Sequence, residues 1–225
     1  MENKNTGITP ALTLADFDRD ARLAAGGAAI IVGVDEAGRG PLAGPVCAAA
    51  CHIPPTLYEH AALRAVNDSK KLTPAKRDKI YAELIKLPII WCLGYASAAE
   101  IDRINILQAT FLAMRRALAK FNNQDIFALV DGNHKIPQIR HAQRAVIGGD
   151  AKSLCIAAAS ILAKVSRDNY MCAAHALHPH YGFEGHKGYG TQAHMDAVMQ
   201  HGPCREHRRT FEPVATICCG LFGGR

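Results

Sequence analysis

Short apolar runs alternate with amphipathic segments along the chain. Runs of small or β-branched apolar residues, bounded by glycine, proline or polar residues, predict buried strands. These strands are expected at residues 30–34, 46–52, 88–96, 126–130 and 144–147. Capping residues followed by helical periodicity predict helices at residues 13–25, 56–66, 73–86, 98–121, 152–177 and 192–201. Strands that alternate with helices indicate an α/β fold, and the short connections between the early strands indicate a mixed sheet.

Three of the predicted strands end in acidic residues. Asp35 and Glu36 follow the first strand, Asp131 follows the fourth, and Asp150 follows the fifth. In an α/β sheet, groups at strand ends converge on one edge, so we expect these four carboxylates to surround a shared site. Like charges raise each other's pKa, and a divalent cation would neutralise them. Oxygen ligands suit Mg²⁺ or Mn²⁺, so the pattern predicts two hard cations held by four carboxylates.

The acidic pair presents a geometric difficulty. Neighbouring side chains on a regular strand point to opposite faces, so Asp35 and Glu36 face one site only if the backbone leaves the strand. We expect it to do so near Glu36, where Ala37 and Gly38 permit it. Each acid alone is also compatible with a helix N-cap or a solvated strand end, an interpretation that Asp150 by itself favours because a helix follows it.

A glycine-rich turn follows the acidic pair. Gly38, Gly40 and Gly44 leave backbone N–H groups uncovered for a closely approaching ligand. A Walker motif is excluded because Arg39 stands where lysine is needed, and the dinucleotide fingerprint fails because Gly44 comes one residue late. The turn therefore gives little support to a nucleotide-binding protein.

Composition and charge narrow the class of protein. The 225 residues are 49% hydrophobic and 20% charged, which indicates one globular domain that buries a core without disulfides. The formal net charge of +6 and the pI of about 8.9 fit a polyanionic partner such as nucleic acid. The same charge is also compatible with a mildly basic protein that has no such partner.

Cysteine and histidine usage favours neither a disulfide scaffold nor a zinc site. The eight cysteines include no C-x-x-C pair. Seven histidines lie between His175 and His207 without a convincing ligand spacing to cysteine, so we expect them to cap, pack or touch substrate. No signal pattern and no apolar run of spanning length is found. We therefore expect a cytoplasmic protein with free thiols and no membrane association.

Six short motifs link these residues in a fixed order. They are Asp35-Glu-Ala-Gly-Arg-Gly-Pro-Leu-Ala-Gly-Pro-Val46, Asp68-Ser-Lys-Lys-Leu72, Val130-Asp-Gly-Asn133, Gly149-Asp-Ala-Lys-Ser153, Ala158-Ala-Ser-Ile-Leu-Ala-Lys-Val-Ser-Arg-Asp168 and Tyr181-Gly-Phe-Glu-Gly-His-Lys-Gly-Tyr-Gly-Thr191. In this order the chain resembles ribonuclease HII, the type 2 ribonuclease H family, over residues 30–213. Six motifs in the right order are far more specific than any one of them.

The resemblance implies a fold and a division of the chain. The fold is that of ribonuclease H, a five-stranded mixed sheet flanked by helices, with a helical C-terminal extension. Residues 1–29 form an N-terminal tail and short helix, residues 30–178 the catalytic core, and residues 179–225 an extension that contributes to substrate binding. We expect a monomer.

The resemblance also implies a catalytic centre. It assigns catalysis and the binding of two Mg²⁺ or Mn²⁺ ions to Asp35, Glu36, Asp131 and Asp150. In two-metal phosphodiester hydrolysis, one ion lowers the pKa of the attacking water and the other stabilises the leaving oxygen. The products are a 3′-hydroxyl and a 5′-phosphate. Asp168, inside a long predicted helix, is expected to pair with an arginine or to support the site from behind.

Substrate recognition follows from the same resemblance. The Gly-Arg-Gly turn reads a ribose 2′-hydroxyl through its backbone, and Tyr189 senses the RNA–DNA junction; without the resemblance, Tyr189 is an ordinary surface aromatic. Basic residues in or near the motifs are candidates for phosphate contacts. The expected substrate-binding residues are Gly38, Arg39, Gly40, Lys70, Lys71, Lys152, Ser153, Lys187 and Tyr189, with Arg208 and Arg209 as further phosphate-contact candidates.

We therefore predict an endoribonuclease that cuts the RNA strand of RNA–DNA hybrids and single ribonucleotides embedded in duplex DNA, as in ribonucleotide excision repair.

Three alternatives compete with this prediction. A type 3 ribonuclease H carries an N-terminal substrate-binding domain, for which the 29 residues before Ile30 are too few, and typically has lysine at the position of Arg39. An integrase- or resolvase-like DNA nuclease has the same fold, which does not fix function. A non-catalytic nucleic-acid-binding protein is the third alternative.

Overall fold

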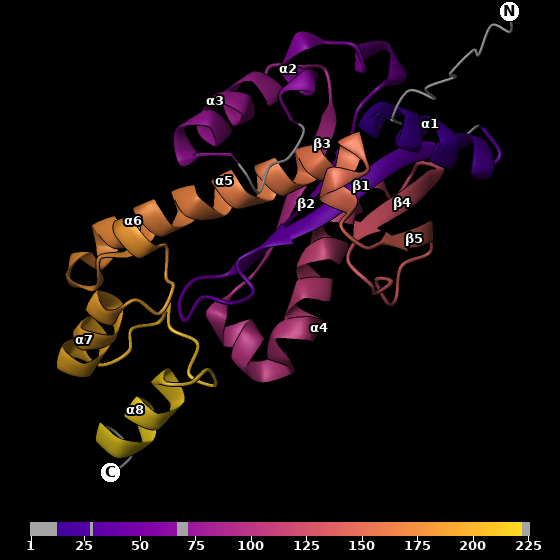
Figure 1. Cartoon of the computed structure of the whole chain (residues 1–225). Coiled ribbons are helices and arrows are strands. Elements are labelled where there is room, and N and C mark those ends of the chain that lie inside the picture. Colours follow the sequence, from indigo (N-terminus) through magenta and orange to yellow (C-terminus); the bar gives the residue numbers. More distant parts are fainter. Residues whose placement is uncertain (1–12, 28, 67–71, 222–225) are drawn as a thin grey trace, which may run out of the picture.

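A five-stranded mixed sheet lies between two long helices. The computed structural model describes residues 13–27, 29–66 and 72–221 (Figure 1). The strands are β1 Ile30–Ala37, β2 Val46–His52, β3 Ile90–Ala96, β4 Ile126–Asp131 and β5 Ala142–Val146, in the sheet order β3-β2-β1-β4-β5. The predicted α/β fold with a mixed sheet of five strands is confirmed.

Helices cover both faces and one end of this sheet. The α-helices are α1 Leu14–Ala24, α2 Ala61–Arg64, α3 Pro74–Leu84, α4 Ala98–Leu118, α5 Leu154–Leu177, α6 Phe183–His186, α7 Gln192–His201 and α8 Val214–Leu221. The short 3₁₀ turns are η1 Pro55–Leu57, η3 Ala119–Phe121, η4 Gly149–Ala151 and η5 Pro179–Tyr181. Figure 1 shows α6, α7 and α8 beyond one end of the sheet, opposite to α1. In the described part of the chain, no helix is both long and apolar enough to cross a membrane.

The register of β1 places two acids side by side. β1 runs antiparallel to β2 and parallel to β4. Val34 and Val130 are the last pair of the parallel ladder, so the residues that follow, Asp35 and Asp131, lie next to each other where this ladder ends. The predicted convergence of strand-end acids thus follows from the pairing itself.

The two faces of β1 bury different clusters, as the alternation of side chains along a strand requires. Ile31 packs with the α5 side chains in one core cluster. Val32 and Val34 pack with the α4 side chains in a second cluster on the other face. A third cluster joins the C-terminal helices to the second half of α5, with Met171 and Phe183 among its buried residues. The helix α5 is therefore shared by the sheet and the C-terminal region.

The helix α1 is fastened to the start of α5. Thr13 caps α1 as predicted, and its capping box is completed by Asp16. Asp18 has no exposed surface; it accepts hydrogen bonds from Ser153 Oγ at 2.6 Å and from the Cys155 backbone N–H at 2.9 Å. Burial raises the pKa of Asp18. Asp18 and the N-cap residue Ser153 thus together satisfy N–H groups at the beginning of α5.

Two predicted helices differ from those observed, and two observed helices were not predicted. The segment 56–66 forms η1 and the single turn α2 instead of one helix. The helix predicted over 98–121 bends at Asn105, whose φ of 64° and ψ of 165° are not helical. Asn105 Oδ1 accepts the Gln108 N–H at 3.1 Å, which caps the turn that restarts the helix. The helix α7 has the predicted bounds, whereas α6 and α8 were not predicted.

Replacing Gly33 with alanine should destabilise the fold, because β1 and α5 approach each other backbone to backbone at this point. A Cβ on Gly33 would lie 2.1 Å from the Cys155 carbonyl carbon. We expect Gly33→Ala to lose about 2–3 kcal/mol of unfolding free energy, which urea denaturation measures. The control is Gly185→Ala, where a Cβ meets nothing within 4 Å; an equal loss in both variants would contradict this explanation.

Candidate active site

Three carboxylates form a charged cluster where the pairing between β1 and β4 ends. Asp35 is 4% exposed, and burial together with the charges of Glu36 and Asp131 raises its pKa well above the ordinary value of 3.8. A hydrogen bond from Ser160, on α5, partly opposes this shift. Burial also raises the pKa of Glu36, while Arg39, whose Nη1 lies 3.3 Å from Glu36 Oε1, lowers it. The cluster thus holds more negative charge than its surroundings neutralise.

The strand does not end where it was predicted to end. β1 keeps its pairing with β2 through Ala37, so the expected departure of the backbone near Glu36 is wrong. What ends is the pairing with β4, whose last partner on β1 is Val34. Beyond that point β4 no longer flanks β1, and Glu36 lines a hollow that Ser160 also lines. The end of the parallel ladder, not a break in β1, lets both acids reach one region.

Asp150 approaches the cluster through the turn η4. The Gly149 backbone N–H donates to Asp131 Oδ1 at 2.6 Å, which ties this turn to the end of β4. A Cβ on Gly149 would lie 2.5 Å from Ile156 Cδ1, so this residue has room only for hydrogen. The next residue, Asp150, is 5% exposed. The structure thus brings Asp35, Glu36 and Asp131 together and places Asp150 one residue beyond the Asp131 contact.

A hollow of about 340 Å³ opens beside the carboxylates. We call it the site hollow; its lining residues are Glu36, Ala37, Gly38, Arg77, Ser160, Lys164 and Tyr189. Neither Arg77 nor Lys164 was among the expected site residues, although Lys164 lies in the motif that runs from Ala158 to Asp168. Arg77 comes from the first turn of α3 and Lys164 from the middle of α5, and only the packing of these helices brings their charges to the acidic edge.

The glycine turn forms one wall of the site hollow. Gly38 is buried with a φ of +91°, and a Cβ there would lie 1.9 Å from Arg167 Nε. At Gly40, by contrast, a Cβ would meet nothing within 4 Å, and both Arg39 and Gly40 are exposed. Gly38 is therefore required by the protein itself, whereas nothing in the fold requires glycine at position 40.

Tyr189 lies on the same hollow with an exposed ring. Its relative exposure is 45%, and Lys164 Nζ lies 5.8 Å from the ring centroid. Its carbonyl oxygen accepts a hydrogen bond from His194 Nδ1 at 2.9 Å, and His194 Nε2 lies 3.1 Å from His207 Nε2. Burial lowers the pKa of His194 to about 4 and that of His207 to about 3, so both are neutral near pH 7. A buried, uncharged histidine pair thus fixes the backbone below the tyrosine.

Of five other predicted substrate contacts, three lie in the described part of the chain. Lys152 is exposed, but its Nζ donates to the Ile147 carbonyl at 2.7 Å. Ser153 is fully buried as the N-cap of α5, so contact with substrate is not supported by its position. Lys187 Nζ contacts Cys172 Sγ and the Glu184 carbonyl. Lys70 and Lys71 lie outside the described residues.

Two further expectations are corrected by the packing. Arg208 has no exposed surface and donates to backbone carbonyls, so it does not contact phosphate, whereas Arg209 is exposed. The pairing of Asp168 with an arginine is the second: Lys164 Nζ, not an arginine, lies 2.8 Å from its Oδ1, while the alternative, that Asp168 supports the site from behind, stays a prediction.

The described residues include ligands that suit a hard cation but no preformed metal site. Among residues 13–27, 29–66 and 72–221, no three histidine, cysteine or acidic side chains are close enough to hold a metal ion as they stand. The histidine-rich region therefore contains no preformed zinc site among these residues. The donor chemistry at the strand ends nevertheless fits a hard cation, because carboxylates are buried together there with raised pKa values.

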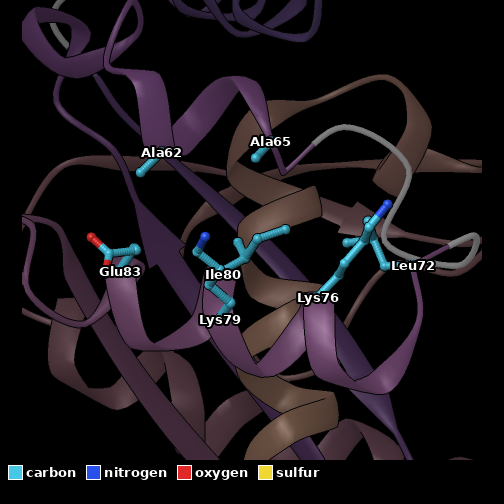
Figure 2. Close-up of a pocket in the computed structure, with 7 residues that line it drawn as sticks. All are labelled: Ala62, Ala65, Leu72, Lys76, Lys79, Ile80 and Glu83. Carbon is cyan, nitrogen blue, oxygen red and sulfur yellow. The ribbon is translucent and has the colours of Figure 1, made fainter.

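A second hollow, of about 390 Å³, lies away from the carboxylates between α2 and α3. Figure 2 shows Lys76, Lys79 and Glu83 along α3, with Ala62 on the facing segment. Its lining is mainly apolar, with lysine amines and a single carboxylate, and it holds none of the strand-end acids. The site hollow is therefore the better candidate for chemistry.

Known proteins share both the sequence and the fold. The sequence model of the family described as Ribonuclease HII matches residues 32–214. A ribonuclease HII from Delftia acidovorans is 50% identical over 188 residues, which cover 84% of this chain and 78% of the relative. One from Parvibaculum lavamentivorans is 54% identical over 187 residues, covering 83% and 68% of the two chains.

Solved structures agree with these relatives. The ribonuclease H2 from Pyrococcus horikoshii has a TM-score of 0.65 and 28% identity, covering 83% of this chain and 96% of its own. A type 3 enzyme, Bst-RNase HIII in complex with Mn²⁺, has a TM-score of 0.70 at 17% identity, covering 88% of this chain and 72% of its own, and shows the shared fold alone. The matching family model and the relatives near 50% identity decide the assignment. This chain belongs to the ribonuclease HII family and is a ribonuclease H enzyme.

Proposed function

We propose that this enzyme cuts the RNA strand of RNA–DNA hybrids and single ribonucleotides embedded in duplex DNA, leaving a 3′-hydroxyl and a 5′-phosphate. The observation that carries the proposal is the cluster of Asp35, Glu36 and Asp131, in which burial raises the pKa of Asp35 and of Glu36, so that an added positive charge would be favourable there. Family membership supports the ribonuclease H activity, and the glycine turn beside the cluster, with Arg39 and Gly40 exposed, supports a substrate that carries a 2′-hydroxyl.

The proposed ligands are Asp35, Glu36, Asp131 and Asp150, which would hold two Mg²⁺ or Mn²⁺ ions. When bound, such ions make water a nucleophile near neutral pH and stabilise the leaving oxygen. One oxygen of Asp35 accepts the Glu36 N–H at 2.7 Å, so this carboxylate is oriented by the protein before any ion arrives. Asp131 is oriented in the same way by Gly149. The carboxylates must turn toward one another to share an ion.

Substrate positioning is the second part of the proposal. The N–H groups of the Gly38-Arg39-Gly40 turn would bind the 2′-hydroxyl, and the Tyr189 ring would stack on the neighbouring deoxyribose. Arg77 and Lys164 line the same hollow and would contact phosphates, which positions a duplex without reading its sequence. The proposed enzyme is a cytoplasmic monomer, and cysteines that form no disulfide fit that location.

The alternatives predict different cleavage results. A DNA nuclease of the same fold would cut an all-DNA duplex, and a non-catalytic binding protein would cut nothing. The deciding assay uses a DNA duplex with one ribonucleotide beside an all-DNA duplex, each with Mg²⁺ or with EDTA. Cutting only at the ribonucleotide, and only with metal, is the expected outcome.

Replacing Asp35 with asparagine should lower cleavage by about 10³-fold or more while stabilising the metal-free fold. Because the folded-state pKa of Asp35 is raised above 3.8, its ionisation destabilises the apoprotein progressively as pH rises from 3.8 through the folded-state value. Scanning calorimetry at pH 7 should therefore show a Tm higher by on the order of a few degrees for Asp35→Asn.

Mn²⁺ should raise the Tm of the wild type, because it binds the folded state, and raise that of Asp35→Asn less. The control is Asp196→Asn on α7, whose carboxylate accepts a hydrogen bond from Gln192; it should keep wild-type activity and response to Mn²⁺. An active Asp35→Asn enzyme would refute the ligand assignment.

A methyl group at Gly40 should interfere with substrate alone. Since a Cβ there meets nothing within 4 Å, Gly40→Ala should keep the wild-type Tm. The added carbon would hold the ribose away from the turn, so kcat/KM on the single-ribonucleotide duplex should fall by about 10- to 100-fold. A variant with full kcat/KM would show that the backbone at position 40 does not approach the substrate.

Removing the Tyr189 ring should weaken recognition of the junction. Stacking in nucleic-acid sites is worth about 1–3 kcal/mol, so Tyr189→Ala should lose about 10- to 100-fold in kcat/KM on the single-ribonucleotide duplex. Tyr189→Phe should lose less because its ring remains. Mn²⁺ affinity, measured by calorimetry, should be unchanged in both variants. If Tyr189→Ala matches the wild type, junction sensing lies elsewhere.

A further inference from the structure

Two arginine side chains are completely buried behind the glycine turn. Arg167 comes from α5 and Arg208 from the segment after α7, and each has a relative exposure of 0%. Within the described part of the chain, the hydrogen bonds of both guanidinium groups go to backbone carbonyl oxygens. Buried arginines usually pair with a carboxylate, so this arrangement calls for a reason.

Arg208 holds both ends of the turn. Its Nη1 donates to the Arg39 carbonyl at 2.7 Å, and its Nη2 donates to the Gly38 carbonyl. Its Nε and Nη2 also donate to the Gly44 carbonyl, at 3.1 Å and 3.0 Å. One planar group thus collects three carbonyl oxygens that converge from different peptides.

The orientation of these carbonyls fixes the orientation of the N–H groups that follow them. A trans peptide is planar, with its C=O and its N–H pointing in opposite directions. Since the Gly38 and Arg39 carbonyls point toward Arg208, the N–H groups of Arg39 and Gly40 point away from it. These are the groups that the proposed function assigns to the 2′-hydroxyl.

Arg167 connects the turn to the loop that carries Tyr189. Its Nε donates to the Pro45 carbonyl at 2.9 Å and its Nη2 to the Ala43 carbonyl at 3.0 Å. Its Nη1 donates to the Lys187 carbonyl at 3.0 Å, two residues before Tyr189. One guanidinium thereby sets the distance between the two segments proposed to read a ribonucleotide.

The segment that carries Arg208 is itself anchored. The Arg208 backbone N–H donates to the Leu42 carbonyl at 2.9 Å. Asp102, on α4, accepts the N–H groups of Arg209 at 2.9 Å and Thr210 at 3.0 Å. The segment that carries Arg208 is therefore held both by α4 and by the chain that follows the glycine turn.

We propose that Arg208 and Arg167 are positioning residues for ribonucleotide recognition, an inference that rests on the proposed reading of the 2′-hydroxyl by the turn. Arg208 aims the N–H groups of the turn, and Arg167 sets their spacing to Tyr189. Neither side chain touches the substrate. A lysine cannot replace Arg208, because its ammonium is a compact point charge and lacks the planar fork that reaches three carbonyls.

The test compares the affinities of two fluorescent duplexes, one of DNA with a single ribonucleotide and one of DNA alone. Fluorescence anisotropy in EDTA measures both Kd values while the proposed metal-dependent cleavage is off. The ratio of the Kd values does not change if part of a variant is misfolded, so it separates positioning from a loss of stability. Arg208→Lys should lower the preference for the ribonucleotide by about tenfold, or to none. Its affinity for the all-DNA duplex should stay within about twofold, because a buried residue contacts no phosphate.

The matched control is Arg205→Lys, three residues before Arg208 but exposed, which should keep the wild-type preference. A preference that Arg208→Lys leaves unchanged, or an equal loss of affinity for both duplexes, would overturn the proposal. Wild-type protein that binds both duplexes equally would contradict the proposed function instead.

A second variant covers the case in which Arg208→Lys does not fold. Asp102→Ala removes the hydrogen bonds from the Arg209 N–H, the Thr210 N–H and the Thr210 hydroxyl, and leaves both buried guanidiniums in place. Its preference for the ribonucleotide should fall by about threefold, since a looser segment aims the turn less well. An unchanged preference in a folded Asp102→Ala protein would also overturn the proposal.

Discussion

The packing of α5 against β1 is the constraint on which the rest of the site depends. The two backbones touch at Gly33, and from there one side of α5 follows the strand and then the turn. Ser160 meets Asp35, and Arg167, seven residues further along the helix, lies under Gly38. Seven residues are close to two helical turns, so both side chains leave α5 on the same side. A single helix therefore fixes the positions of the acids and of the glycine turn relative to each other.

Much of this arrangement could be predicted, because it depends on local patterns. Apolar runs that end in Asp35 or Asp131 indicate strand ends, and the order of the motifs indicates the family. The continuation of β1 through Glu36 could not be predicted, since only the lengths of the neighbouring strands decide where each ladder ends. The same holds for Ser153 and Arg208. A basic residue near a nucleic-acid motif is expected on the surface, and only the folded chain shows which carbonyls converge on it.

Carboxylates and buried guanidinium groups lie close to the glycine turn without fully neutralising one another. Burial and neighbouring acids raise the pKa of Asp35, while burial and the nearby Arg167 lower the pKa of Arg208 to about 9. The exposed Arg39 reaches Glu36, but the buried guanidiniums are satisfied by carbonyl dipoles instead of carboxylates. Sites that are prepared for a charged ligand commonly lower the stability of the protein without it, and the surrounding apolar clusters offset that cost.

The contact between Asp18 and the start of α5 changes how the N-terminal segment should be regarded. By sequence, the residues before β1 are a tail and a short helix, outside the predicted catalytic core. Yet the buried Asp18 carboxylate accepts hydrogen bonds from the Ser153 hydroxyl and the Cys155 N–H. Both donors lie at the N-terminal end of α5, the helix that carries Ser160 and Arg167. A shortened protein that begins at β1, prepared for crystallography or for fusion to another enzyme, would leave these donors bare in the interior. The practical minimum for an engineered version of this enzyme therefore includes α1.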